Sequence, residues 1–304
     1  MHSGHQHSIG LVGAGKVGIV LATALVRAGH TVVSVWDPSP TAVDGARETL
    51  GDFQAASTVA EATAGADLVL LAVPDDVLQG LVETLAAEGN DWHGVNVVHV
   101  SGRYGAVVLG PLSEQGAAAI ALHPAMAFSG DRDTELSRIT GARFAVTAED
   151  RMTAENLVQD MGGIPFKVDE SDRIMYHAAM THASNHLVTL IVQSSAMLAS
   201  ISIKDTSEVL RPALAAALEN ALVRGAAGAT GPVVRGDIGT VTEHIRALSE
   251  RMPEILPVYG VMSQAGADIA LTAGRISEDV RQRVGQAVGA PSNGSEPQHA
   301  SGGS

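Results

Sequence analysis

A glycine-rich segment close to the start of the chain could bind a dinucleotide. Gly13-Ala14-Gly15-Lys16-Val17-Gly18 has the spacing GxGxxG, and it joins an apolar run at residues 9–12 to a helical pattern at residues 17–28. In this motif the first glycine makes a tight turn, the second lets the backbone approach a pyrophosphate, and the third lets the helix pack on the strand. The N–H groups at the start of the helix then point at the phosphates. A glycine turn without a ligand is the alternative.

A single acidic residue, Asp37, bears on which dinucleotide is bound. It follows the next apolar run, Thr31–Trp36, and stands nineteen residues after Gly18 (37 − 18). An acid at this distance accepts hydrogen bonds from the hydroxyls of the adenosine ribose. The same carboxylate repels a 2′-phosphate, and residues 38–41 contain no lysine or arginine to receive one; the nearest cation along the chain is Arg47. We therefore expect NAD(H) to be favoured over NADP(H).

Further candidate site residues stand at the ends of three later apolar runs. Val73 and Pro74 end one run, Ser101 and Gly102 follow the next, and His123 ends a third. Open α/β sheets gather their ligands at the carboxyl ends of the strands, so we expect the first four residues to contact the cofactor. A histidine at such a strand end can exchange a proton with a substrate oxygen, and a purely structural histidine in a turn is the alternative.

A second group of polar residues lies in an uncharged stretch between Arg173 and Lys204. His182, Asn185 and His186 recur there at intervals of three and four, which places them on one face of a helix. Asn185 could orient a substrate, and hydrogen bonding between helices is the alternative. No third ligand stands at a suggestive spacing from the two histidines, so we expect no metal site.

A third group lies around a loop rich in glycine and proline at residues 231–237. Arg235 in such a loop is suited to gripping a carboxylate with two N–H groups, and Asp237 and His244 accompany it. A surface ion pair of Arg235 with Asp237 around a helix cap is the alternative. The pair Thr240 and Glu243 has the spacing of a capping box, which predicts that a helix opens at Thr240.

The elements that must position these residues divide the chain in two. Short apolar runs alternate with helical patterns over residues 8–169, which predicts a doubly wound α/β Rossmann domain with a parallel sheet covered on both faces. Residues 170–288 show only helical patterns and predict an all-α domain. The polar ends, residues 1–7 and 289–304, are expected to be a disordered arm and a disordered tail.

Composition excludes several classes of protein. The 304 residues include no cysteine, which rules out disulfides and thiolate chemistry. The formal net charge of −14 makes nucleic acid and membrane surfaces poor partners. The polar N-terminus does not have the pattern of a signal peptide, and the uncharged stretch contains too many polar residues for a membrane span. We therefore expect a cytoplasmic protein.

Taken together, these motifs resemble the Rossmann-like family whose C-terminal half is domain of unknown function 2520, within the wider 6-phosphogluconate and β-hydroxyacid dehydrogenase-like group. The resemblance spans residues 9–271. It is carried by Gly13-Ala14-Gly15-Lys16-Val17-Gly18, Leu122-His123-Pro124, Tyr176-His177-Ala178-Ala179, Ala183-Ser184-Asn185, and residues 230–237 with His244. It implies a nicotinamide-dependent oxidoreductase that forms a homodimer through its helical domains and binds substrate between the domains. The chain is also distantly similar to ketopantoate reductases and prephenate dehydrogenases.

The resemblance also suggests roles, with one departure. Dehydrogenases of the wider group place a catalytic lysine four residues before the asparagine, where this chain has Thr181. Prephenate dehydrogenases use a His-Pro histidine, so His123, or else His182, is expected to exchange the proton while Asn185 orients the substrate. Arg235 is expected to hold the carboxylate of a small keto or hydroxy acid, with ketopantoate as one candidate. The alternatives are an NAD(H) sensor without turnover and a deazaflavin-linked NAD(P) reductase.

Overall fold

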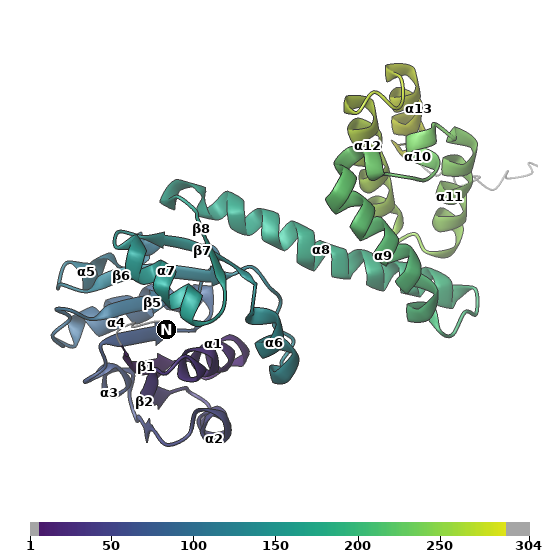
Figure 1. Ribbon diagram of the computed structural model, residues 1–304. Helices are drawn as coiled ribbons and strands as arrows, with labels where there is room; N and C mark the ends of the chain where they lie inside the picture. Colours follow the sequence, from purple (N-terminus) through teal and green to yellow (C-terminus); the bar gives the residue numbers. More distant parts are fainter. Residues whose placement is uncertain (1–5, 290–304) are drawn as a thin grey trace, which may run out of the picture. The chain divides into compact units, whose positions relative to one another are not determined.

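The computed structural model describes residues 6–289, which form two compact units that meet between His186 and Leu187. The first unit contains an eight-stranded sheet (Figure 1). Its strands are β1 (Ser8–Val12), β2 (Thr31–Trp36), β3 (Gln54–Ala55), β4 (Leu68–Leu71), β5 (Asn96–His99), β6 (Ala118–Pro124), β7 (Arg143–Ala148) and β8 (Ile164–Lys167). The two-residue strand β3 is too short to be predicted from an apolar run.

The strand order confirms the predicted doubly wound fold. The order is β3-β2-β1-β4-β5-β6-β7-β8, so the chain changes direction across the sheet between β1 and β4. Strands β1 to β6 are parallel, whereas β7 pairs antiparallel with β6 and β8 pairs parallel with β7. The predicted parallel sheet is therefore confirmed for β1 to β6, whereas β7 and β8 run in the opposite direction to these strands. An apolar run shows that a strand is buried, but its direction depends on the path of the connection that precedes it.

Helices cover both faces of the sheet, as predicted. They are α1 (Lys16–Arg27), α2 (Pro40–Leu50), α3 (Val59–Thr63), α4 (Asp75–Ala87), α5 (Gly110–Ser113), α6 (Arg132–Ile139) and α7 (Arg151–Asp160). Side chains of β4 alternate between two hydrophobic clusters: Leu70 packs in one with Leu21 of α1, and Val69 packs in the other with Leu78 of α4. The sheet is thus buried on both sides.

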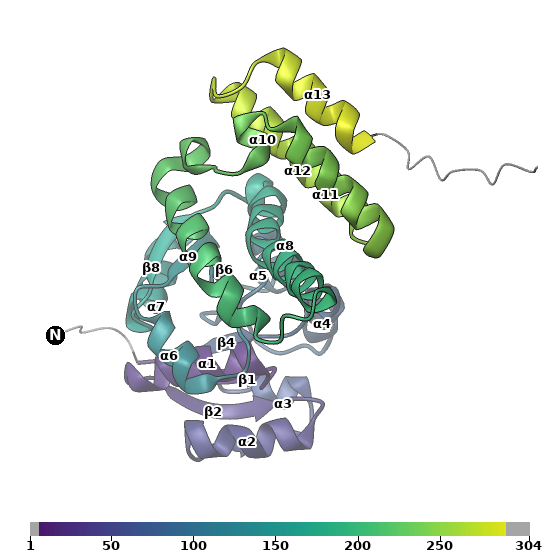
Figure 2. The same cartoon turned by 90° about the vertical axis from the view of Figure 1, so that its right-hand side faces the viewer.

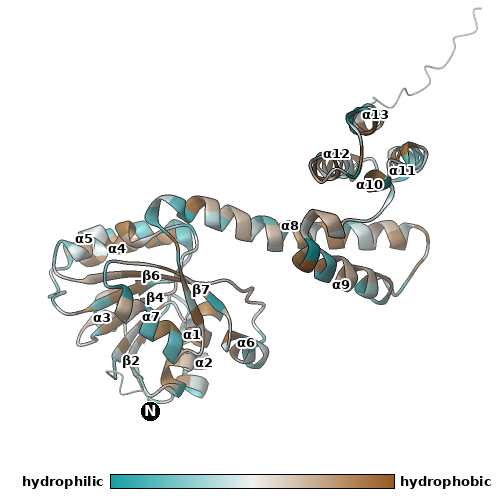
Figure 3. Cartoon of the chain, turned by 45° about the horizontal axis from the view of Figure 1, so that its top comes forward, coloured by the Kyte–Doolittle hydropathy of each residue, from teal (hydrophilic) through white to brown (hydrophobic). Residues whose placement is uncertain are grey.

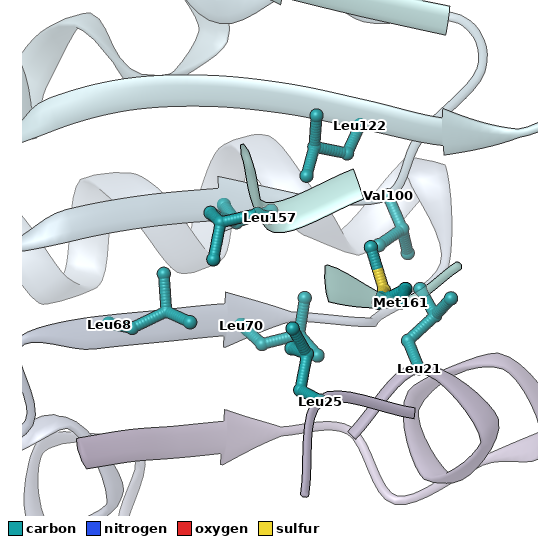
Figure 4. A pocket seen from close by; sticks show the side chains of 9 residues that line it. Leu21, Leu25, Leu68, Leu70, Val100, Leu122, Leu157 and Met161 are labelled. Carbon is teal, nitrogen blue, oxygen red and sulfur yellow. The ribbon is translucent and has the colours of Figure 1, made fainter. Parts of the chain in front are cut away.

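One small internal cavity lies within the first of these clusters. It has a volume of about 10 Å³, and its lining is entirely apolar (Figure 4). Leu21 and Leu25 of α1, Leu70 of β4 and Leu157 of α7 are among the lining residues. A cavity that could hold at most one water molecule and offers it no polar partner is a packing gap and not a ligand site.

The second unit is helical. Helix α8 (Arg173–Ser200) passes from the first unit into the second, where it is followed by α9 (Thr206–Arg224), α10 (Pro232–Arg235), α11 (Ile238–Arg251), α12 (Leu256–Thr272) and α13 (Glu278–Gly289). Helices α11, α12 and α13 pack against one another (Figure 2). Helix α11 begins at Ile238 and not at Thr240, because Asp237 supplies the N-terminal cap by accepting a hydrogen bond from the backbone N–H of Thr240.

The two ends of the chain are described only in part. His7 was expected to belong to a disordered arm, but its backbone N–H donates to Nδ1 of His30 at 3.1 Å and the two rings stack. The prediction was therefore wrong for His7, which this contact holds next to β1. Residues 1–5 of the predicted arm and residues 290–304 of the predicted tail lie outside the described residues, whereas Gly289, expected in the tail, is the last residue of α13. Within residues 6–289, no helix combines the length and the apolar character that crossing a bilayer requires.

Candidate active site

A cavity of about 710 Å³ opens at the carboxyl edge of the parallel strands in the first unit. Its walls come from the segments that follow β1, β2, β4 and β5, from the end of β6 and from His177 near the start of the helix at residues 173–200. The predicted site residues among its lining are Gly13, Gly15, Lys16, Val17, Asp37, Val73, Pro74, Ser101, Gly102 and His123. The volume lies in the range that small-molecule and cofactor sites occupy, roughly 300–1,000 Å³.

The three glycines of the GxGxxG motif differ in what surrounds them. Gly13 has a φ of +98°, and a side chain there would collide with the carbonyl of Ala72. A side chain at Gly18 would collide with the carbonyl of Gly13 and come within 2.9 Å of the Ala72 Cβ. At Gly15, in contrast, no heavy atom lies within 4 Å of the position that a Cβ would take. The turn, the close packing of α1 and the open approach therefore fit the pyrophosphate of a dinucleotide.

Asp37 links the end of β2 to the glycine turn. One carboxylate oxygen accepts a hydrogen bond from the Ala14 N–H at 2.8 Å, and the other accepts from the Ser39 N–H at 2.8 Å. The nearest cation along the chain after Asp37 is occupied elsewhere: Arg47 donates to the carbonyl of Phe53 at 3.0 Å and lies over the Phe53 ring. Asp37 thus presents a carboxylate to the cavity at the expected place for the ribose.

His123 is held by residues at the start of α8. Its Nδ1 lies 2.7 Å from the hydroxyl oxygen of Tyr176, and its ring centroid lies 6.2 Å from that of His177. A Cβ at Gly102 would lie 2.9 Å from Nε2 of His123 and 2.8 Å from Cδ2 of His177, so Gly102 leaves room for both rings. Burial, together with the nearby His177 and Arg173, lowers the pKa of His123 to about 4. The imidazole is therefore neutral at pH 7.

Arg173 places a fixed positive charge in the protein interior beside this pair. It is only 1% exposed; its Nε donates to the Thr147 hydroxyl at 2.8 Å, and one terminal nitrogen donates to the carbonyls of Ala121 and Ala145. The other terminal nitrogen is buried without a hydrogen-bond partner, and no carboxylate of residues 6–289 forms an ion pair with the guanidinium. A buried charge without a counter-ion is costly and uncommon in proteins.

His99 supports the loop that carries Ser101. Its Nε2 donates to the carbonyl of Gly105 at 2.8 Å, and its Nδ1 accepts from the N–H of Ser101 at 3.2 Å. Burial lowers the pKa of His99 to about 4, so this imidazole is neutral as well. Both ring nitrogens bind the backbone, so His99 positions the loop and does not face a ligand.

Comparisons with known proteins agree with this architecture. A Rossmann-like domain model matches residues 3–124, and the model of a domain of unknown function, DUF2520, matches residues 142–265. The chain joins a Rossmann-like domain to a DUF2520 domain. The DUF2520 match begins just before β7, so the antiparallel end of the sheet belongs to it together with α8.

Three solved structures share the fold of this Rossmann-like DUF2520 protein at 18% sequence identity. A protein from Bacteroides fragilis described as an NADP oxidoreductase has a TM-score of 0.73 over 86% of this chain and 98% of its own. Protein TM1727 from Thermotoga maritima has a TM-score of 0.67 over 88% and 99%. A reductive aminase from Aspergillus terreus, in complex with NADPH and ethyl levulinate, has a TM-score of 0.66 over 92% and 99%. No curated protein is significantly similar in sequence.

The remaining predicted residues lie outside the cavity lining. His182, Asn185 and His186 are exposed on α8, where Nδ1 of His182 lies 2.9 Å from Nδ1 of His186. Asn185 contacts the hydroxyl of Ser184 at 3.0 Å. No group of three or more side chains that could hold a metal ion occurs in the described part of the chain.

Arg235, Asp237 and His244 belong to the second unit, within the DUF2520 match. Arg235 is exposed at the end of α10, and the carboxylate of Asp237 accepts from both the N–H and the hydroxyl of Thr240. Nδ1 of His244 lies 2.7 Å from the hydroxyl oxygen of Tyr259. The capping contacts of Asp237 account for that residue locally. The expected convergence of Arg235 with His123 and Asn185 stays a prediction.

Sequence reasoning gave no role to Arg173, Tyr176 or His177, although the last two were part of a family motif. A signal for Arg173 was present: it is the last charged residue before the uncharged stretch that ends at Lys204. A lone arginine at the start of an otherwise uncharged helix is a candidate for a buried contact.

Proposed function

We propose that the protein is an NAD(P)(H)-dependent oxidoreductase that acts on a small keto or hydroxy compound bearing a carboxylate. The observation that carries this proposal is the single cavity that brings the GxGxxG turn, Asp37 and His123 together. A bound nicotinamide would supply the hydride in reduction or accept it in oxidation, and the protein would correspondingly donate or accept the proton. The solved relatives described as an NADP oxidoreductase and a reductive aminase support a redox role for this fold.

Different residues of the first unit would bind different parts of the cofactor along the cavity. The open side of Gly15 and the N-terminus of α1 would receive the pyrophosphate, and Asp37 would accept from the ribose hydroxyls. Ser101 and Gly102 would border the nicotinamide, beside His123. His123 is neutral, so it would act by a hydrogen bond and a proton transfer from its ring N–H.

Two predicted residues outside the cavity lining keep their expected roles in this proposal. Arg235, in the second unit, would bind a carboxylate with two N–H groups, and Asn185, in the first unit, would orient a substrate oxygen. Of the keto acids, ketopantoate is one candidate substrate. The side chain of Arg235 is exposed and therefore accessible to a ligand.

For the cofactor we propose a preference for NAD(H) over NADP(H). Asp37 would repel a 2′-phosphate, and the contacts of Arg47 with Phe53 keep that guanidinium engaged. Calorimetric titration with NADH and NADPH tests this, with tighter binding of NADH expected. Tighter binding of NADPH would reverse the assignment.

The oxidoreductase proposal is tested by the consumption of NADH and NADPH at 340 nm. The panel contains 2-keto acids including ketopantoate, a cyclic imine and a deazaflavin. We expect turnover of a keto acid. Turnover of only the imine or the deazaflavin would show that the proposed substrate class is wrong and that the proposed oxidoreductase reaction is right. Tight NADH binding without any turnover would indicate a sensor. No heat with either coenzyme would overturn the proposal.

We also propose that the protein is a homodimer formed through its helices. Arg173 is the one buried residue of α8, and no residue of α9 is buried. Large apolar side chains such as Val188, Val192 and Leu222 are left exposed on these two helices, and apolar segments are evident along α9 (Figure 3). Long helices with apolar residues on all sides are typical of buried positions, and a second copy of the chain would bury them.

A further inference from the structure

The contact between Tyr176 and His123 fixes the position of a proton. A neutral imidazole carries one proton, on either Nδ1 or Nε2, and the hydrogen bond at Nδ1 decides between them. Among residues 6–289, the only hydrogen-bond partner found for the Tyr176 hydroxyl is Nδ1 of His123, at 2.7 Å. If Nδ1 carried the proton, the half-buried phenol would have no acceptor for its own among these residues and would have to donate to solvent. The phenol therefore donates and Nδ1 accepts.

This arrangement leaves the ring proton of His123 on Nε2. The Nε2 edge lies against Gly102, and both residues line the large cavity. His123 thus offers the cavity a hydrogen-bond donor. Without Tyr176, the two neutral forms of an imidazole have similar energies, and Nε2 would be an acceptor for part of the time.

The buried guanidinium of Arg173 favours the same arrangement. Its positive charge makes the phenol of Tyr176 a stronger donor and disfavours a second proton on His123. The charged and titratable groups that face His123 are Tyr176, His177 and Arg173 of α8, together with His99 of β5. None of these is an acid, and no carboxylate within residues 6–289 is hydrogen-bonded to the imidazole, although Asp37 and Asp75 line the same cavity.

We propose that Tyr176 is a positioning residue that holds His123 in its Nε2–H form and donates a proton to its Nδ1 during turnover. The proton-donation step rests on the proposed function, whereas the assignment of the ring proton does not. As the substrate oxygen gains negative charge, its new O–H bond forms while the Nε2–H bond of His123 breaks. Nδ1 at the same time takes the phenolic proton, so the negative charge ends on the Tyr176 oxygen. Solvent later returns a proton to Nε2 while the Nδ1 proton moves back to the Tyr176 oxygen, which restores the starting tautomer.

The positive charge of Arg173 would stabilise the negative charge that this relay places on the Tyr176 oxygen. Burial raises the pKa of Tyr176 to about 12, and the charge of Arg173 opposes that rise. The phenolate that results is still far less basic than the alkoxide that the relay protonates, so the transfer runs downhill. Arg173 forms no ion pair in the described part of the chain, although the carboxylate of Glu170 acts on its charge, and the transient phenolate would be a second anionic group near it.

The experiment is nitrogen-15 NMR of the histidine side chains combined with the kinetics of Tyr176→Phe. The signals of His123 are identified by their loss in His123→Asn. We expect the wild-type protein to show a protonated Nε2 and an unprotonated Nδ1 from pH 6 to 8. In Tyr176→Phe we expect a mixture of the two neutral forms and a fall in kcat of about 10- to 100-fold with little change in KM. Tyr104→Phe, which removes a hydroxyl outside the cavity lining, is the matched control.

The outcomes separate this inference from the proposed function. A proton on Nδ1 in the wild type, or an unchanged ring in Tyr176→Phe, overturns the assignment of the tautomer. Wild-type turnover that Tyr176→Phe leaves unchanged overturns the relay alone. If the expected NMR pattern is found but no compound of the panel is turned over, the relay fails together with the proposed function and the tautomer assignment stands.

Discussion

At the scale of single residues, two histidines of the first unit share a low pKa but differ in what their rings contact. His99 binds the backbone through both nitrogens, at Gly105 and Ser101, whereas His123 binds a side chain through Nδ1 and has Nε2 beside the cavity. Burial lowers both pKa values to about 4. The difference in contacts, and not the pKa, therefore separates a structural histidine from a candidate for proton transfer.

Replacing His123 by asparagine should lower kcat by roughly 10² to 10⁴, the usual contribution of a positioned proton donor. The dissociation constant for NADH should stay within about twofold, because the glycine turn and Asp37 are untouched. Stopped-flow kinetics and calorimetry measure the two quantities. His93→Asn, at a side chain that is 82% exposed, is the control. Normal turnover in His123→Asn would remove His123 from the mechanism.

The buried histidines should also make stability depend on pH. The pKa of His99 is about 4 in the folded protein and about 6.5 in the unfolded chain, so the unfolded chain binds a proton first as the pH falls. The contribution of neutral His99 to the free energy of unfolding is complete above pH 6.5 and is lost between pH 6.5 and 4. Over this range the free energy of unfolding falls by up to about 1.4 kcal/mol per pH unit because of His99. Urea unfolding at pH 7.5, 6.5, 5.5 and 4.5 measures it. A free energy of unfolding that stays level over this range would contradict the burial of His99.

At the scale of elements, the turn between β1 and α1 combines two tasks that substitutions can separate. Gly18 is required by the packing of α1, whereas Gly15 faces open space and has the φ of −75° that any residue can adopt. Gly15→Ala should leave the free energy of unfolding within about 0.5 kcal/mol of wild type and weaken NADH binding by about tenfold or more. Gly18→Ala should instead destabilise by about 1–3 kcal/mol through overpacking. Urea unfolding measures the stability of the two variants, and calorimetry measures their binding of NADH. Tight NADH binding by Gly15→Ala would show that the pyrophosphate does not bind beside Gly15.

The elements also show how far the sequence could predict this molecule. Strands β1, β2, β4, β5 and β6 and the residues at their carboxyl ends were predicted, because each buried strand is an apolar run and the ends of parallel strands meet at one edge. The roles of Tyr176 and Arg173 were not predicted. Tyr176 stands 53 residues after His123, and the contact depends on the antiparallel path through β7 and β8 that no local pattern records.

At the scale of the whole molecule, the two units differ in how much apolar surface they bury. The first unit has a hydrophobic cluster on each face of its sheet, whereas α9 buries none of its 19 residues. This contrast supports the proposed association through the helices of the second unit.

Leu222→Glu should therefore shift the protein from a dimer toward the monomer mass of 31.2 kDa. Leu222 is 76% exposed, and a buried carboxylate at a dimer contact would cost several kcal/mol. Sedimentation equilibrium measures the mass. Val107→Glu, at a residue of the first unit that is 71% exposed, should leave the dimer intact. A wild-type protein that sediments as a monomer would contradict the proposed association.

The anchoring of α8 to the sheet decides where this polypeptide could be cut. A fragment that stops at residue 169, where the strand pattern ends, would lack the guanidinium that bridges Ala121 and Ala145 and the phenol that contacts His123. A fragment that continues to His186 keeps both. A chimera that contains the sheet of the first unit should therefore also contain the first turns of α8.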